Sequence, residues 1–337
     1  MTEQGNGLSI KAAVAWFPPD REGPSSGELS AQDVERIGVT ELTVSQLAAP
    51  EMAVLAARDA LKESGVEPDG IGYLVHSHLY HQGFDIWSPA HYIAHQAGTV
   101  GSLPINVQQT CNGGALALHL AATWLTATPD AGAALVTAAD RFAGPGFDRW
   151  TSDDEAVYGD SGAAVVLGRR GGGNDVLDLL ALEMAADPTF ETQLRGDDKF
   201  GPAPLWHSTP VSFTRPNNVF RASSQAAQLG KSGVEKLFGA VQRALGKAEV
   251  APEDIRCVAI PRLIRLMRES VFKPGIGLLL GRQPEYLETD TGCLGPAEYL
   301  ANLTDMAAAL NPGEVGMLIQ GGGGFTFSCT IVRRSAN

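Results

Sequence analysis

The pattern of apolar and polar positions along the chain predicts helices that alternate with short strands. One amphipathic helical stretch ends near Ser64, a turn of proline and acidic residues follows, and an apolar strand begins over residues 71–75. A second helical stretch ends in the same way before a strand over residues 255–260. Because both strands are almost continuously apolar, we expect sheets covered on both faces, in a mixed α/β fold.

These two segments match each other. Residues 59–71 correspond to residues 243–255 over thirteen positions with a constant offset of 184, as from Pro68 to Pro252. Helix–turn–strand units are common, so chance similarity is the alternative, but a single offset favours duplication.

The ends of the two halves support the same interpretation. Each half closes on a glycine-rich turn and a strand that finishes in two arginines, over residues 159–170 and 321–334. We therefore expect an N-terminal half, residues 1–172, that carries a nucleophile. The C-terminal half, residues 173–337, is expected to carry the remaining active-site loops.

Cys111 is the strongest candidate for chemistry. It lies between a β-like run and a long Ala/Leu-rich segment that reaches Leu125, which predicts a thiol at the first turn of a helix. Unpaired backbone N–H groups and the positive end of the helix dipole favour a thiolate there. Gly113 and Gly114 are expected to leave the helix start bare for a substrate carbonyl. A small buried apolar residue is the alternative interpretation of Cys111.

The repeat predicts a second thiol beside the first. An offset of 184 from Cys111 gives Gly295, within the sequence Thr-Gly-Cys-Leu-Gly at residues 291–295. Equivalent loops of two duplicated halves meet near the axis that relates them, so we predict that Cys293 faces the same pocket. Three roles are open to it: a second acyl station, a disulfide partner that switches the enzyme off, or a small residue that fills space.

Three motifs carry a resemblance to a known family. They are Thr-Cys-Asn-Gly-Gly at residues 110–114, Tyr-Gly-Asp-Ser-Gly-Ala-Ala-Val-Val-Leu-Gly at 158–168 and Gly-Gly-Gly-Phe-Thr-Phe at 322–327. In this order they resemble the thiolase superfamily, specifically its β-ketoacyl-acyl-carrier-protein synthase III branch. The resemblance implies a thiolase-like five-layer αβαβα fold, a homodimer, and Cys111 as the acyl acceptor. It also implies an oxyanion hole formed by the backbone N–H groups of Cys111 and Gly323.

Two positions depart from the family pattern. Condensing members use a His in Pro-His-Gln-Ala-Asn and an Asn in Gly-Asn-Thr-Ser to polarise a malonyl thioester and assist loss of carbon dioxide. Arg262 and Cys293 stand at these positions here. A guanidinium is not a base near neutral pH, and a thiol is a poor hydrogen-bond donor.

The acylation half-reaction needs only Cys111 and the oxyanion hole. The Gly-x-Leu-Gly motif followed by Glu298 also resembles a secondary-metabolite subset that passes the acyl group to a hydroxyl or amine. We therefore predict an acyltransferase that is loaded by coenzyme A or a phosphopantetheinyl acyl carrier protein and acts on a small-molecule acceptor, with no cofactor of its own. Decarboxylative condensation and a non-catalytic partner subunit of a synthase are the alternatives.

Several residues are candidates for substrate binding. Arg149 aligns with a family segment that contacts the coenzyme A nucleotide, which places it at the donor entrance. His207, in a loop-like segment, is expected to cover the pocket, and His78 and Glu298 are further candidates for a base; a structural role is the alternative for each.

Three arginines at i, i+3 and i+6 predict a basic stripe on one helix. They are Arg262, Arg265 and Arg268, and such a stripe suits a phosphopantetheine phosphate or an acidic carrier protein. A solvated helix face is the alternative. Residues 18–49 lack the Trp-containing segment that typical members place beside adenine, which favours a carrier protein over coenzyme A as the donor.

Composition narrows the class of protein. The 337 residues are 44% hydrophobic and 19% charged, as in ordinary globular enzymes. A formal net charge of −13 argues against a nucleic-acid partner. No apolar stretch reaches the ~18 residues that a membrane span needs, and the first residues lack a secretion-signal pattern. The four cysteines show no zinc-type spacing, so we expect a cytoplasmic protein.

Overall fold

A computed structural model describes residues 7–25, 29–171 and 174–336 of the chain. Ten strands form one sheet in the order β10-β9-β11-β12-β8-β1-β7-β6-β4-β5. The N-terminal half contributes β1 (Leu8–Trp16), β4 (Ile71–Ser77), β5 (Leu103–Val107), β6 (Ala133–Asp140) and β7 (Ser161–Arg169). The C-terminal half contributes β8 (Leu177–Ala186), β9 (Ile255–Ala259), β10 (Glu285–Tyr286), β11 (Val315–Gly322) and β12 (Thr326–Arg334).

The strand order is symmetric about its centre. From the middle outward the first half runs β1-β7-β6-β4-β5 and the second runs β8-β12-β11-β9-β10, so each strand has a counterpart in the other half. In both halves the three outermost strands pair in parallel and the next is antiparallel. Residues 8–10 of β1 pair with residues 177–179 of β8, and this short antiparallel seam joins the two five-stranded sets.

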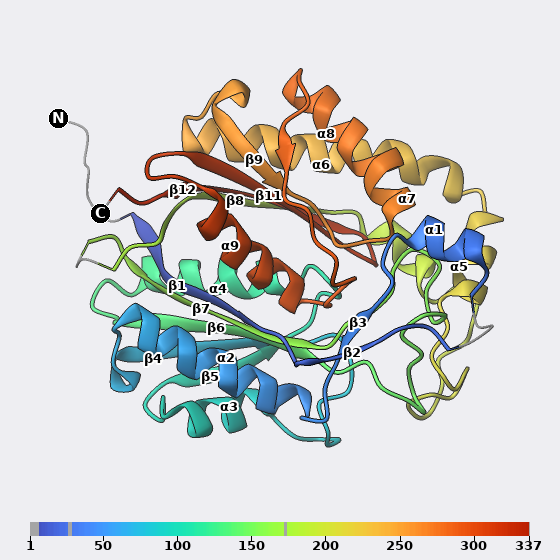
Figure 1. Cartoon of the computed structure of the whole chain (residues 1–337), viewed down its shortest axis with the longest axis horizontal. Coiled ribbons are helices and arrows are strands. Elements are labelled where there is room, and N and C mark those ends of the chain that lie inside the picture. The colour runs from blue at the N-terminus through green and yellow to red at the C-terminus, as the bar shows by residue number, and fades with distance from the viewer. Residues whose placement is uncertain (1–6, 26–28, 172–173, 337) are drawn as a thin grey trace.

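Helices fill and cover the sheet in layers (Figure 1). Helices α4 (Gly113–Ala127) and α9 (Ala297–Ala309) lie between the two five-stranded sets and contact each other. Helices α2 (Ala49–Ser64) and α3 (Pro89–Ala97) cover the outer face of the first set. Helices α6 (Ala226–Ala248) and α8 (Lys273–Leu280) cover the outer face of the second. The predicted five-layer α/β fold is confirmed.

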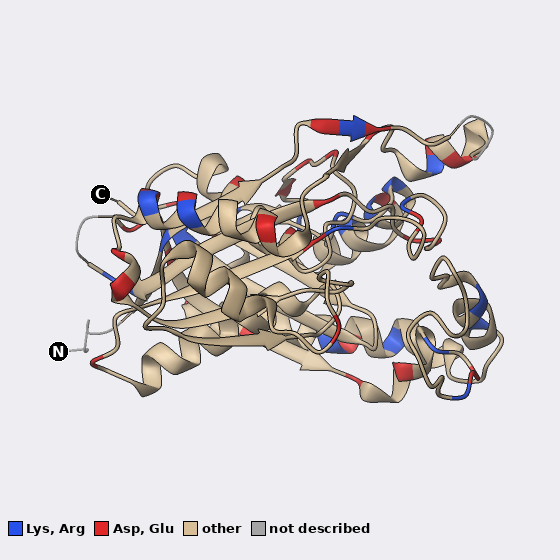
Figure 2. Cartoon of the chain, turned by 90° about the horizontal axis from the view of Figure 1, so that it is seen from below, with Lys and Arg blue, Asp and Glu red and all other residues tan. Residues whose placement is uncertain are grey.

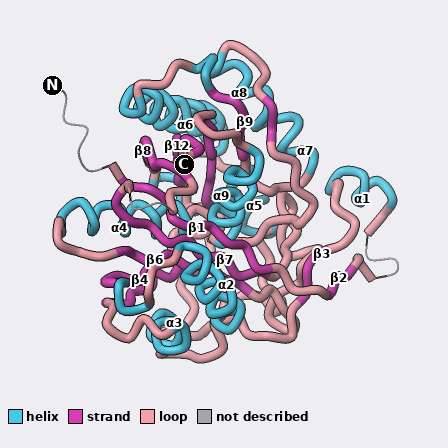
Figure 3. Tube along the Cα trace, turned by 60° about the vertical axis from the view of Figure 1, so that its left-hand side comes forward, coloured by secondary structure: helices cyan, strands magenta, loops and turns pink. Residues whose placement is uncertain are grey.

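The remaining elements are short. They are strands β2 (Asp20–Glu22) and β3 (Leu42–Val44), helices α1 (Ala31–Ile37), α5 (Thr214–Arg221) and α7 (Arg265–Met267), a π-helical turn (Arg268–Phe272), and 3₁₀ turns η1 (Pro68–Gly70), η2 (Pro188–Gln193) and η3 (Pro252–Asp254). Figure 3 shows the strands running through the middle of the molecule with helices on either side.

Alternation along the strands explains why the layers form. On β6, Ala134 and Val136 point into the central core with α4 and α9, whereas Ala133 and Leu135 point into the outer core under α2 and α3. Successive strand side chains face opposite sides, so a fully apolar strand is buried on both. Lys, Arg, Asp and Glu lie mostly on the outer helices and loops (Figure 2).

The sequence repeat coincides with equivalent structure. Helix α2 ends at Ser64 and α6 at Ala248, each followed by a left-handed residue, a proline-led 3₁₀ turn and a strand. Helices α4 and α9 also begin 184 residues apart, at Gly113 and Ala297. The predicted boundary between residues 172 and 173 lies outside the described residues. No helix in the described part of the chain is long and apolar enough to cross a membrane.

Candidate active site

Cys111 lies in the turn between β5 and α4, and its side chain is partly exposed. Thr110 has a positive φ of 47°, and this turn is closed by hydrogen bonds from Asn112 N to Gln109 O (3.1 Å) and from Gly113 N to Thr110 O (3.1 Å). Helix α4 begins at Gly113, so Cys111 precedes the N-cap residue Asn112 instead of lying in the first turn. It still lies at the positive end of the helix, where an anion is favoured.

The glycines after Cys111 serve a purpose other than the predicted one. A Cβ at Gly113 would overlap Ser77 Oγ, and a Cβ at Gly114 would overlap the carbonyl oxygen of Pro296. Their missing side chains therefore admit β4 and the start of α9, not a substrate. Bare backbone at this point lets the two central helices begin close together.

The second thiol is where the repeat predicted it. Cys293 Sγ lies 3.8 Å from Cys111 Sγ, and the Cys293 side chain is fully buried. Its backbone is fixed by hydrogen bonds from Cys293 N to Val157 O (2.7 Å) and from Gly159 N to Cys293 O (3.0 Å). The hydrogen bond with Cys111, burial and neighbouring negative charge raise the pKa of the Cys293 thiol well above its usual value.

Glu298, in the first turn of α9, is buried next to Cys293. Its Oε1 accepts hydrogen bonds from Arg262 N (2.9 Å) and Gln320 Nε2 (3.0 Å). Burial raises the pKa of this carboxyl, and its hydrogen bonds, including one with the Cys293 thiol, act in the opposite direction. Glu298 also contributes to the raised pKa of Cys293, so this carboxyl and the Cys293 thiol form a buried pair beside the partly exposed Cys111.

Arg262 is held by the protein. The guanidinium donates to Asn302 Oδ1 (2.9 Å), Thr291 Oγ1 (2.8 Å) and Asp305 Oδ2 (2.6 Å), and only 3% of the residue is exposed. Each of its three nitrogens therefore donates to α9 or to the loop that precedes it, which indicates a structural role.

The predicted basic stripe is wrong. Arg262 lies before helix α7, Arg265 pairs with Glu35, and the buried Arg268 pairs with Glu288. The helix starts only at Arg265, so the three arginines do not share one helix face. Each guanidinium has an acidic partner of its own.

Gly323 lies in the turn between β11 and β12, beside Cys111. Thr110 Oγ1 donates a hydrogen bond to Gly323 O (3.0 Å), and a Cβ at the neighbouring Gly322 would crowd Asn112 N and Gln109 O. The glycine turn and the Cys111 turn are thus in direct contact. The role of the Gly323 N–H in an oxyanion hole stays a prediction.

Arg149 and His207 do not join the thiols. Arg149 forms a bidentate ion pair with Asp160, at 2.6 and 2.8 Å, and is buried. This guanidinium is therefore bound within the protein, and its contact with an acyl donor stays a prediction. His207 is exposed in a loop next to the exposed Trp206, and its role also stays a prediction.

An aromatic cluster around the thiols was missed. Cys111 and Cys293 pack with Phe142, Phe147 and Tyr158, whose ring centroids lie 4.7–5.1 Å apart. Tyr158 belongs to a motif that the sequence analysis had singled out, but isolated Phe residues in an irregular segment follow no periodicity. The Tyr158 hydroxyl donates to Asp153 Oδ2 (2.7 Å).

His78 lies near the turn that holds Cys111. Its Nε2 is 2.9 Å from the side-chain nitrogen of Gln108, and burial lowers the pKa of His78 to about 4. The imidazole is therefore neutral at neutral pH.

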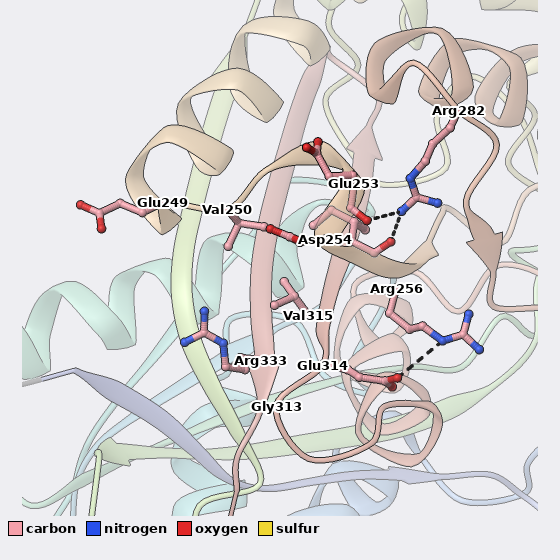
Figure 4. A pocket seen from close by; sticks show the side chains of 11 residues that line it. Glu249, Val250, Glu253, Asp254, Arg256, Arg282, Gly313, Glu314, Val315 and Arg333 are labelled. Atoms are coloured by element: carbon pink, nitrogen blue, oxygen red, sulfur yellow. Dashed lines mark hydrogen bonds and ion pairs between the residues drawn. The ribbon is translucent and has the colours of Figure 1, made fainter.

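A cavity of about 550 Å³ lies far from this chemistry (Figure 4). Its lining includes Val315, at the start of β11, whereas the Cys111 turn meets the end of that strand. Arg256 there pairs with Glu314, and Arg282 donates to backbone carbonyls. The cavity carries no nucleophile and is not a candidate active site.

Comparisons with known proteins agree with the motifs. The family described as 3-oxoacyl-[acyl-carrier-protein] synthase III matches residues 105–188. β-Ketoacyl-[acyl-carrier-protein] synthase III of Oleidesulfovibrio alaskensis is 23% identical over 288 residues, which cover 84% of this chain and 83% of that protein.

Solved structures extend the similarity over the whole chain. The structure of ChlB3, described as an acyltransferase, is 30% identical with a TM-score of 0.88 and covers 98% of both chains. The priming β-ketosynthase of the R1128 polyketide pathway is 17% identical with a TM-score of 0.76, over 98% of this chain and 96% of that one, which shows a shared fold. The resemblance seen in the motifs is confirmed, and the chain belongs to the β-ketoacyl-acyl-carrier-protein synthase III family of the thiolase superfamily.

Proposed function

We propose that the chain is an acyltransferase of secondary metabolism that carries its acyl group on Cys111. The donor is a thioester of coenzyme A or of a phosphopantetheinyl carrier protein, and the acceptor is a small molecule with a hydroxyl or amine. The observation that carries this proposal is the bonding of Arg262 to Asp305, Asn302 and Thr291, which leaves no base at the position of the condensing histidine. The 30% identity to a structure described as an acyltransferase supports it.

The reaction has two steps. The Cys111 thiolate attacks the thioester carbonyl, and the tetrahedral oxyanion is stabilised by the N–H groups of Cys111 and Gly323. Collapse breaks the carbon–sulfur bond to the donor, whose thiolate takes a proton from solvent and leaves as a thiol. The acceptor then attacks the acyl-Cys111 carbonyl, gives its proton to solvent, and displaces the Cys111 thiolate. Neither step requires a cofactor.

Homodimer formation and a cytoplasmic location are part of the proposal. Strand β5 lies at the edge of the sheet. Leu103 on this strand is 60% exposed, and Val100 just before it is 76% exposed. An exposed apolar edge strand is typical of a surface that pairs with a second copy. All four cysteines are free thiols, as a reducing compartment favours.

Intact-protein mass spectrometry tests the proposal. Matched acyl-coenzyme A and acyl-carrier donors are each incubated with the wild-type chain, Cys111→Ala and the control Cys329→Ala, whose thiol is buried in another core. We expect a mass increase of one acyl group in the wild type and the control, and none in Cys111→Ala. An unloaded wild type, or loading that persists in Cys111→Ala, would instead favour a non-catalytic subunit.

Decarboxylative condensation is the second candidate, because the matching family model and the Oleidesulfovibrio relative are both synthases. Carbon dioxide release from a malonyl thioester separates the two functions. An acyltransferase passes its acyl group to a hydroxyl or amine acceptor without releasing carbon dioxide.

A further inference from the structure

The two neighbouring thiols have different surroundings. Cys111 is partly exposed and precedes helix α4, whereas Cys293 has no exposed surface. The positive end of the α4 dipole lies next to Cys111 and favours an anion there. Burial favours the neutral thiol at Cys293 and outweighs the hydrogen bond with the Gly295 backbone, which favours the anion. The 3.8 Å separation of the sulfur atoms is within hydrogen-bonding distance for a thiol and a thiolate.

The negative charge around Cys293 acts in the same direction. The hydrogen bond with Cys111, burial, and the charges of Cys111 and Glu298 raise the pKa of the Cys293 thiol. Cys293 therefore keeps its proton when Cys111 has lost its own. A thiol is a weak donor to a neutral thioester oxygen, but a charged acceptor strengthens the bond.

Other groups in the cluster are engaged elsewhere. The Tyr158 hydroxyl donates its proton to Asp153 Oδ2 (2.7 Å). The Arg262 guanidinium donates to Asn302, Thr291 and Asp305. The Cys293 thiol has two acceptors for its single proton, the Glu298 carboxyl and Cys111 Sγ at 3.8 Å, and a Cys111 thiolate competes for it through its full charge.

The donor is also held in place before the reaction. Backbone hydrogen bonds to Val157 and Gly159 fix Cys293 from both sides, and a Cβ at the preceding Gly292 would overlap Val157 O. A group fixed in this way stabilises charge without rearranging when the charge appears.

We propose that Cys293 donates an S–H···S⁻ hydrogen bond to the Cys111 thiolate, in the resting enzyme and again when the acyl group leaves. The proton stays on Cys293 throughout, so no proton transfer between the sulfurs is involved. Attack on the donor turns the thiolate into a thioester, and attack by the acceptor restores it, so the bond matters at both steps. This use of the bond rests on the proposed acyl transfer, whereas the bond itself does not.

The same assignment excludes one role for Cys293. A buried thiol that keeps its proton is a poor nucleophile, since the thiolate is the reactive form. Cys293 is therefore not a second acyl station.

Alkylation of Cys111 by iodoacetamide across a range of pH, read by peptide mass spectrometry, tests the hydrogen bond. In Cys293→Ala we expect the midpoint of the alkylation profile to rise by about one pH unit, which lowers the rate below the midpoint roughly tenfold. In Cys293→Ser a hydroxyl donor replaces the thiol, and the wild-type midpoint is expected to be retained. Cys329→Ala is the control for loss of a buried thiol elsewhere, and it leaves the midpoint unchanged.

Three results would overturn the proposal. The first is an unchanged or lowered midpoint in Cys293→Ala, and the second is a serine variant that behaves like the alanine variant. The third needs no variant: alkylation of Cys293 ahead of Cys111 in the wild type would reverse the direction of the bond. Because alkylation uses no acyl donor, a shifted midpoint in a chain that fails to load acyl groups would refute the proposed function and leave the hydrogen bond standing.

Discussion

Buried His76 makes the stability of the protein dependent on pH. The side chain lies at the end of β4 with no exposed surface, its Nδ1 is 3.0 Å from Thr137 Oγ1, and its Nε2 is 3.2 Å from Gln82 Oε1. Burial, followed by the proximity of His78, lowers the pKa of His76 from 6.5 to about 3. Between these two values the unfolded chain binds a proton that the folded chain does not, so acid favours unfolding.

The size of the effect follows from the two pKa values. At pH 7 the folded histidine is neutral, and about a quarter of the unfolded chains carry a proton at this position. At pH 5 the unfolded histidine is nearly fully charged and the folded one is still neutral. The difference lowers the free energy of unfolding by about 2 kcal/mol between pH 7 and pH 5, and the loss continues until the pH approaches 3.

Urea unfolding of the wild type and His76→Asn at both pH values measures this contribution. Asparagine is polar and does not titrate, so its own cost appears at both pH values and cancels from the comparison. We expect the variant to lose about 2 kcal/mol less than the wild type on going from pH 7 to pH 5. Equal losses in the two proteins would refute the argument that His76 stays neutral in the fold.

Further predictions concern packing, charge and oxidation. In thermal melts, Gly114→Ala should lower the free energy of unfolding by about 2 kcal/mol or more, because its Cβ overlaps the carbonyl of Pro296. In the same melts Gly246→Ala, which lies in open space on α6, should raise the free energy of unfolding by about 0.5–1 kcal/mol. Equal effects at the two glycines would contradict the packing argument. Arg149→Met leaves the buried Asp160 carboxylate without its cation and should cost about 3–5 kcal/mol in urea unfolding, and a cost below 1 kcal/mol would argue against this role. Treatment with diamide should join Cys111 to Cys293 in a disulfide, because their sulfur atoms lie only 3.8 Å apart. Peptide mass spectrometry should show the loss of two hydrogens, absent from Cys293→Ala, and reduction should restore acyl loading.

The sequence predicted those parts of the structure that follow from repetition and from strand and helix patterning. The offset of 184 residues relates the ends of α2 and α6 and the starts of α4 and α9, and through them it predicted the meeting of Cys111 and Cys293. Apolar runs predicted strands that are buried on both faces. These features depend on local order along the chain, which a single sequence contains.

Errors arose where distant residues decide the outcome. The arginine spacing predicted a stripe, but the start of helix α7 at Arg265 excludes Arg262, whose partners lie 29 to 43 positions further along the chain. Gly114 was expected to admit a substrate, but it admits Pro296. A glycine in a short motif shows that no side chain is present at that position, but only the folded structure shows which atoms fill the space.

The two central helices, α4 and α9, come from the two similar halves of the chain. The first half places Cys111 ahead of α4, and the second half places Cys293 and Glu298 around the start of α9. The proposed site therefore draws its residues from both halves of one polypeptide. Fission of the gene between them would yield two fragments that regain chemistry only by reassembling along the β1–β8 seam.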